Sequence, residues 1–164
     1  GKLEHWKGAD QLLAIFKKVS EEVGDVRFRV IGDGSMAGMF RRSNMPLELT
    51  GHVPHENMPT FYQDSAASVL PSYMEGAPTT CMESLACGVP CVATRVGDTP
   101  EIVTDGETGF LVDPGDIDAS ADRLIELLED DALRHRMGAQ GRQHVLDNFS
   151  YDKVVRQMLR IYSG

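Results

Sequence analysis

Hydrophobic and polar positions recur along this chain with two periods, one typical of helices and one typical of strands. Between residues 9 and 23, charged residues separate apolar side chains that recur at helical spacing: Leu12, Leu13, Phe16, Val19 and Val23. This spacing predicts an amphipathic helix. The next segment, VRFRVIG (26–32), alternates apolar and polar residues and therefore predicts a strand.

The same succession of strands and helices continues to residue 112. Further strands are expected in LELTGHV (47–53), ASVLPS (67–72, expected to be buried), PCVATRV (90–96) and GFLV (109–112). Helices are expected at 35–44, 56–65, 79–87 and 99–103, and in three stretches from residue 116 to the end. Pro59 is expected to interrupt the helix at 56–65. Thr99 is expected to cap the short helix at 99–103, with Pro100 at its first position.

Strands that alternate with helices favour an α/β fold built from βαβ units. The predicted class is therefore a Rossmann-like, mostly parallel sheet with helices on both faces. No linker divides the 164 residues, so residues 1–164 are predicted to form one domain. In such sheets ligands bind outside the carboxyl ends of the strands, which makes the loops there the first candidates for a site.

Composition narrows the classes of function. The net charge of −9 argues against binding nucleic acid through its phosphates. No apolar run approaches the roughly 18 residues of a membrane span, and no signal peptide is visible. Neither the histidines nor the cysteines have the spacing of a metal site, so no metal is expected. The three cysteines are expected to be reduced core thiols of a cytosolic chain: Cys81, Cys87 and Cys91.

One loop combines several features of a phosphate site. The stretch EGAPTTCME (75–83) follows a predicted strand and opens a predicted helix. Gly76 lets a ligand approach the backbone closely, and Pro78 stiffens the turn. Thr79 and Thr80 bring hydroxyl and N–H groups to the positive end of the helix, an arrangement that suits a phosphate.

The two acids of that stretch suit hydroxyl groups. Glu75 on the loop and Glu83 in the first helical turn are both predicted to face one crevice, where carboxylates accept hydrogen bonds from a sugar or ribose. Purely structural roles stay open at this point. Thr80 and Glu83 have the spacing of a capping box, and Glu75 fits a solvated loop acid.

Three weaker signals lie elsewhere. Lys2 and Lys7 flank a loop that runs into the first helix, and they suit either a diphosphate cradle or two exposed lysines. The segment VIGDGSMAG (30–38) only loosely resembles a dinucleotide fingerprint, so NAD is not expected. His52 and His55 follow a strand end, where they suit a ligand contact or an ordinary surface loop.

Taken together, these motifs resemble the carboxy-terminal half of a retaining glycosyltransferase with the GT-B fold, of the group 1 type. The resemblance covers nearly the whole chain. It is carried by GKLEHWKGADQLLAIF (1–16), IGDG (31–34), GHVPHENMPTFYQDSAASVLPS (51–72) and EGAPTTCMESLACGVPCVATRVGDTPEIVTDGETGFLVDPGD (75–116). The last segment holds the most specific pattern of the family, which is an acid, seven residues and a second acid.

The resemblance assigns roles to particular residues. Lys7 and Glu75 are implied to be catalytic, and Lys7 is implied to bind the donor diphosphate together with Lys2, which stands where the family usually has Arg. Glu75 is also implied to contact the donor sugar. The implied donor-binding set is Lys2, His52 and Val53 beside the base, Glu75, the loop residues Gly76, Ala77, Pro78, Thr79 and Thr80 with their backbone N–H groups (absent in Pro78), and Glu83 at the ribose.

The resemblance also implies a reaction and its partners. A hexosyl group would pass with retention from a nucleotide-diphosphate sugar to a sugar, lipid or polysaccharide acceptor, with lysine in place of a metal and with no cofactor. The family has a further amino-terminal domain and a strand directly before Gly1, so this chain alone is expected to bind nucleotide weakly and to transfer little sugar. The full enzyme would be cytoplasmic, with peripheral association at the inner face of the membrane as an open alternative.

Two rival functions stay open. The chain also suits a non-catalytic nucleotide-binding or regulatory module, or half of a sugar-nucleotide epimerase. The last predicted helix is expected to offer a packing face, formed by Val154, Val155, Met158, Leu159 and Tyr162.

Overall fold

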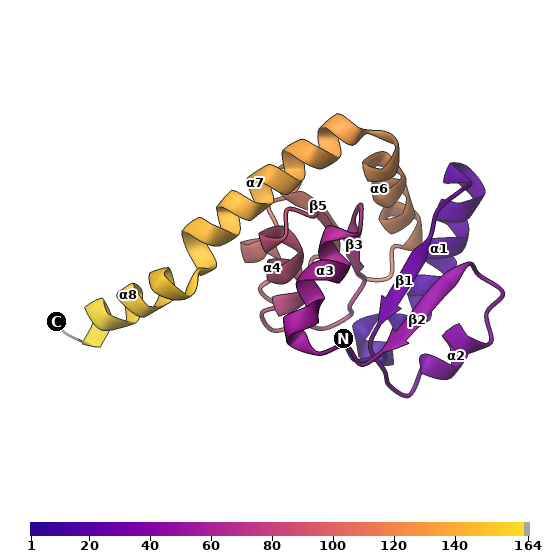
Figure 1. The fold of residues 1–164 in the computed structure, drawn as a ribbon, viewed down its shortest axis with the longest axis horizontal. Helices are drawn as coiled ribbons and strands as arrows, with labels where there is room; N and C mark the ends of the chain where they lie inside the picture. The colour runs from indigo at the N-terminus through magenta and orange to yellow at the C-terminus, as the bar shows by residue number, and fades with distance from the viewer. Residues whose placement is uncertain (163–164) are drawn as a thin grey trace.

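The computed structural model describes residues 1–162 and shows an α/β fold with helices on both sides of parallel strands (Figure 1). The strands are β1 Phe28–Ile31, β2 Leu47–Gly51, β3 Ser68–Leu70, β4 Cys91–Thr94 and β5 Gly109–Val112. The α-helices are α1 Ala9–Val23, α2 Ala37–Arg41, α3 Met58–Gln63, α4 Thr79–Ala86, α5 Thr99–Ile102, α6 Ile117–Glu129, α7 Asp131–Phe149 and α8 Tyr151–Tyr162. Two 3-10 turns, η1 His5–Lys7 and η2 His55–Asn57, precede α1 and α3.

The predicted α/β class and the order of its elements are confirmed, but two local predictions are wrong. Pro59 does not interrupt a helix, because it lies in the first turn of α3, where its missing N–H has no helical partner to lose. Thr99 does not cap α5 either. Asp98 holds the cap position, and the Thr99 hydroxyl is buried without a hydrogen-bond partner.

The strands form two parallel sheets rather than the single sheet expected. In the first sheet β1 pairs with β2, with Phe28 opposite Leu47 and a register shift after Val30. In the second sheet the order is β3-β4-β5, with Ser68 opposite Cys91. The expected strand at 67–72 is also shorter than predicted, and its three paired residues are half-buried rather than buried.

The core lies on both faces of the second sheet. Val92 of β4 packs into one cluster with α1 and α6, whereas its neighbours Cys91 and Ala93 pack into another with α4 and α7. This division follows from the alternation of side chains along a strand. All four residues of β4 and all four of β5 are consequently buried, and among them only Thr94 has a polar side chain.

Caps and glycines fix the long carboxy-terminal helices. The side chain of Asp116 accepts from Ala119 N at 2.8 Å to start α6, and Asp130 starts α7 in the same way. Gly138 of α7 lies against the end of α4, since an added Cβ would stand 2.1 Å from the carbonyl oxygen of Gly88. A larger residue there would force α7 away from the helix that carries the candidate site.

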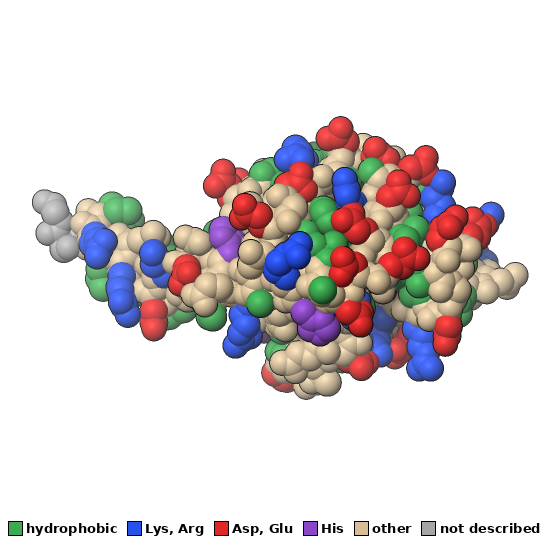
Figure 2. All heavy atoms as spheres, turned by 90° about the horizontal axis from the view of Figure 1, so that it is seen from above, with side chains coloured by type: hydrophobic (Ala, Val, Ile, Leu, Met, Phe, Trp, Pro, Cys, Tyr) green, Lys and Arg blue, Asp and Glu red, His purple; other side chains and the backbone are tan. Residues whose placement is uncertain are grey.

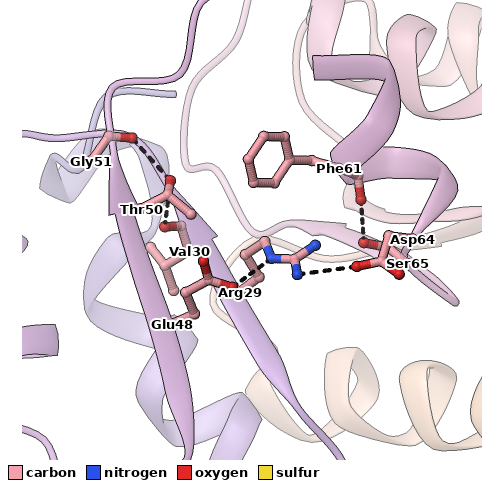
Figure 3. Close-up of polar contacts among 8 residues, drawn as sticks. All are labelled: Arg29, Val30, Glu48, Thr50, Gly51, Phe61, Asp64 and Ser65. Carbon is pink, nitrogen blue, oxygen red and sulfur yellow. Dashed lines mark hydrogen bonds and ion pairs between the residues drawn. The ribbon is translucent and has the colours of Figure 1, made fainter. Parts of the chain in front are cut away.

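A cavity of about 940 Å³ separates the two sheets. Its walls come from the facing strands β1 and β3 and from apolar side chains of α1, α3 and α6. Arg29 of β1 lines this cavity and lies over the ring of Phe61. It donates to Glu48 at 2.9 Å and to Asp64 at 3.1 Å (Figure 3). Arg29 therefore links the first sheet to the segment that leads into the second.

The chain enters beside this cavity as an extended segment. The nitrogen of Gly1 donates to Ile31 O at 2.6 Å, Leu3 N donates to Asp33 O at 2.9 Å, and Lys2 forms a parallel bridge with Asp33. These contacts continue the direction of β1, so the first three residues run parallel to it.

Helix α8 projects from the body of the fold, at the end of the long α7 (Figure 1). Its predicted packing face is exposed in this chain, with Met158 more than half exposed and Tyr162 86% exposed. Figure 2 shows Lys and Arg side chains gathered with hydrophobic ones on this projection, while Asp and Glu side chains dominate the visible face of the body. Within residues 1–162, no helix combines the length and apolar character needed to cross a membrane.

Candidate functional site

The loop after β3 leads into the amino terminus of α4 and leaves it open to solvent. Gly76, Ala77 and Thr79 are exposed, Thr80 is half-buried, and Pro78 is buried at the cap position. No side chain caps this helix start, so the alternative of a capping box between Thr80 and Glu83 does not form. The uncapped N–H groups and the helix dipole make this end electropositive.

Glu75 meets Lys7 at the inner side of this loop. Lys7 Nζ lies 2.7 Å from both carboxylate oxygens, and Ser72 Oγ donates to Glu75 Oε1 at 2.6 Å. The Glu75 side chain is only 5% exposed, so the alternative of a solvated loop acid is wrong. Ser72 was not a predicted site residue, although it ends the strand segment that leads into the loop.

Lys7 and Glu75 each keep one hydrogen-bonding position for a ligand. An ammonium group has three donors, and two of those of Lys7 point to Glu75. A carboxylate has about four acceptor positions, of which Lys7 and Ser72 use three. The ammonium of Lys7 also lies 4.8 Å from the centre of the exposed Trp6 ring. Because the Lys7 side chain is 23% exposed, its remaining donor is within reach of a ligand oxygen beside that ring.

Two glycines hold this pair in place. Gly8 has φ +69°, and a Cβ there would stand 1.8 Å from the carbonyl oxygen of Pro71. Gly97 has φ +53°, and a Cβ there would stand 2.2 Å from the carbonyl oxygen of Glu75. Only glycine combines this backbone conformation with such a close approach. Both glycines are visible in the sequence, but no local pattern there connects Gly97 with the acid it supports.

Glu83 lies in the second turn of α4, not in the first as predicted. The hydroxyl of Tyr62 donates to its Oε2 at 3.2 Å, and His55 Nδ1 lies 3.8 Å from its Oε1. Burial raises the pKa of Tyr62 well above its ordinary value, and the negative charge of Glu83 raises it further. The Glu83 side chain stays 26% exposed.

The first residue lies within electrostatic reach of Lys7 and Glu83. Burial of the Gly1 ammonium and the charge of Lys7 lower the pKa of this amine, whereas the charge of Glu83 raises it. Lys7 and Glu83 thus act electrostatically on the same atom. Gly1, Lys2, Lys7 and Thr80 also line the cavity between the sheets, most of which lies deeper between the strands. Lys2 itself is exposed.

The predicted base-binding residues in the segment after β2 are less clearly placed at the site. His52 is exposed and Val53 is half-buried beyond the end of that strand. It is His55, in the following 3-10 turn, that approaches Glu83. Sequence spacing alone could not choose between the two histidines, because the choice depends on how the turn packs against α4.

The thiols and acids of the described residues form no metal-binding group. Cys81 and Cys91 are buried free thiols with their sulfurs 3.5 Å apart, as expected of core residues, whereas Cys87 is half-buried. Among residues 1–162, no three His, Cys, Asp or Glu side chains form a group that could hold a metal ion.

Comparison with known families identifies the chain. The model of the family described as glycosyl transferases group 1 matches residues 1–144. The chain belongs to the group 1 glycosyltransferases. A curated relative, the D-inositol 3-phosphate glycosyltransferase of Corynebacterium diphtheriae, is 34% identical over 174 residues, which cover 99% of this chain and 40% of the relative.

Solved structures show which half of a glycosyltransferase this is. The carboxy-terminal domain of LpcC, a group 1 glycosyltransferase from Francisella tularensis, superposes with a TM-score of 0.83 at 23% identity, covering 92% of this chain and 84% of that one. Staphylococcus aureus TarM, solved as a mutant with UDP among its ligands, superposes with a TM-score of 0.89 at 20% identity, covering 100% of this chain and 34% of TarM. This glycosyltransferase chain therefore has the fold of a carboxy-terminal GT-B half.

The matched length limits what the comparison says about activity. The chain spans between 34% and 45% of the curated relatives it matches. The family and the fold of this half are shown by these matches. The reaction of the whole enzyme is a separate question, which depends on the geometry of the site.

Proposed function

We propose that this chain is the donor-binding half of a retaining glycosyltransferase, which transfers a hexosyl group from a nucleoside diphosphate sugar. The observation that carries the proposal is the contact of Lys7 with Glu75 at the open amino terminus of α4. It brings a cation, an acceptor of hydroxyl hydrogen bonds and an electropositive helix end together at one loop.

Each group has a role in this proposal. The third donor of Lys7 and the N–H groups from Gly76 to Thr80, Pro78 excepted, hold the diphosphate, and Lys2 adds a cation at the edge. The remaining acceptor position of Glu75 takes a hydroxyl of the donor sugar. Glu83 accepts from the ribose, and His52 and Val53 border the base. The family membership of the chain supports these assignments.

The chemistry follows from the charge that develops on the leaving group. When the bond between the sugar and the diphosphate breaks, negative charge accumulates on the phosphate oxygen. Lys7 and the dipole of α4 are fixed in advance by packing, so they stabilise that charge without reorganising. This chain binds and activates the donor, and a second domain supplies the acceptor site, which we propose takes a sugar, lipid or polysaccharide.

Calorimetric titration of the intact chain with UDP, GDP and ADP tests donor binding. The critical variant is Lys7→Gln, because an amide keeps a hydrogen bond to Glu75 but removes the charge. The matched control is Lys17→Gln, which removes an exposed lysine paired with Glu21 on α1. We expect Lys7→Gln to weaken the tightest diphosphate at least about tenfold, and Lys17→Gln to leave it unchanged.

Two results would count against the proposal. One is the absence of binding by the wild-type chain to all three diphosphates at millimolar concentration. The other is equal affinity in Lys7→Gln and wild type when circular dichroism shows both to be folded. A product assay with a hexose donor separates the roles further, since sugar transfer is expected only after an amino-terminal GT-B domain is added.

A further inference from the structure

Tyr62 contacts the carboxylate of Glu83 from the interior of the protein, on the side away from solvent. The residue is buried on α3, and its hydroxyl reaches α4. It lies 3.2 Å from Glu83 Oε2 and 3.3 Å from the carbonyl oxygen of Thr80. A hydroxyl carries one proton, so these two acceptors share it. The bond ties the side chain of Glu83 to the helix start that precedes it by one turn.

This contact gives the two carboxylate oxygens of Glu83 different surroundings. Oε2 is occupied from within by the buried Tyr62. Oε1 lies on the side of His55, whose side chain is largely exposed, at 3.8 Å from Nδ1. One oxygen is therefore anchored in the protein, and the other is directed toward the opening.

Tyrosine suits this task because it is a neutral donor. Burial, reinforced by the charge of Glu83, raises the pKa of Tyr62, so the hydroxyl keeps its proton throughout the physiological range. It fixes the carboxylate without neutralising it. Glu75 has the opposite arrangement, since the ammonium of Lys7 compensates its charge at 2.7 Å.

We propose that Tyr62 is a positioning residue, which fixes Glu83 so that the site distinguishes a ribonucleoside diphosphate from its deoxy analogue. The inference rests on the proposed function, because it requires a nucleoside diphosphate with its ribose at Glu83. A carboxylate already held in one rotamer loses little further entropy when two ribose hydroxyls bind to it. Tyr62 acts only through Glu83 and touches no ligand.

The test measures the preference for ribose rather than affinity alone. The intact chain is titrated with whichever of UDP, GDP and ADP binds tightest, with its 2′,3′-dideoxy counterpart and with inorganic pyrophosphate. Tyr62→Phe keeps the ring and its packing but removes the donor. The matched control is Tyr73→Phe, which loses a hydroxyl that bonds to Asp10 instead.

We expect Tyr62→Phe to weaken the ribonucleotide about tenfold, the size typical of a hydrogen bond to a charged group. The dideoxy compound and pyrophosphate should bind as in wild type, so the preference for ribose falls by the same factor. Tyr73→Phe should leave all three affinities unchanged. An equal loss for all three ligands in Tyr62→Phe would show a merely structural role and would overturn the inference, as would an unchanged preference.

A second variant keeps the inference open to refutation whatever the stability of Tyr62→Phe. Glu83→Gln should reduce the preference for ribose on its own, and Tyr62→Phe added to it should reduce it no further. If Tyr62→Phe lowered the preference for ribose as much in the Glu83→Gln background as it does in wild type, Tyr62 would act independently of Glu83. If the wild-type chain binds none of the diphosphates, the proposed function itself fails. If it binds them but shows no coupling, only the role of Tyr62 is rejected.

Discussion

Replacing Lys7 with Met should destabilise the fold more than removing its acidic partner does. The Glu75 side chain is 5% exposed, and in Lys7→Met its carboxylate would remain buried with Ser72 as its remaining donor. Removing one partner of a buried ion pair costs about 3–5 kcal/mol. Because the Lys7 side chain is 23% exposed, water reaches the vacated position, and we expect the lower end, about 3 kcal/mol.

The reverse substitution leaves a different group unpaired. In Glu75→Gln the amide oxygen still accepts from Lys7 or Ser72, and the ammonium of Lys7 turns toward water, so we expect a loss of only about 1 kcal/mol. The double variant Lys7→Met/Glu75→Gln buries no charge. It should therefore be more stable than the sum of the single losses predicts, by a coupling of about 2 kcal/mol.

Urea unfolding followed by circular dichroism measures these differences as free energies of unfolding. The matched control is Lys17→Met, whose partner Glu21 is largely exposed and whose loss should be below about 0.5 kcal/mol. Additive losses within about 0.5 kcal/mol in the double variant would refute the reasoning. So would a greater loss for Glu75→Gln than for Lys7→Met, since either result means that the carboxylate is not buried against the lysine.

Two further predictions concern the interior. Because Tyr62 keeps its proton in the folded state while an unfolded tyrosine loses it, the free energy of unfolding should fall as pH rises above about 10. Urea midpoints between about pH 9 and 11.5 should show a shallower fall in Tyr62→Phe, and equal slopes would contradict the burial of this hydroxyl. The cavity between β1 and β3 should accept a strand that runs parallel to both and continues into Gly1. About five apolar β-branched residues joined ahead of Gly1 should raise the free energy of unfolding by at least about 2 kcal/mol over a Gly-Ser extension of equal length, and equal urea midpoints would exclude this strand.

The order of elements was predictable because local pattern decides it. The apolar stripe of α1 predicted its bounds, Ala9–Val23, without error, since a period of about 3.6 residues sustained over four turns is typical of a helix and not of a strand. The short elements were less certain. In the segment around Pro59, one residue can break a helix or begin it, and the backbone that precedes it makes the difference.

The candidate site was predictable only in its parts. The sequence indicated Lys7, Glu75 and Glu83 by their residue types and by the pattern of the family. It could not show that Glu75 is buried against Lys7, because the two are 68 positions apart and meet only when η1 and the start of α1 pack against the segment after β3. For the same reason it held no sign of Ser72 or Tyr62, whose contacts with the acids come from neighbouring elements.

The α/β class, the succession of strands and helices and the family could all be read from the sequence, because each depends on the period of apolar residues or on motifs within one stretch. Folding brings one acid, Glu75, against the lysine and the other, Glu83, against a tyrosine. It also arranges the strands in two sheets with a cavity between them. These features depend on contacts between segments that are distant in the sequence. The residue pattern within one stretch does not show which of those segments will touch or how deeply their side chains will be buried.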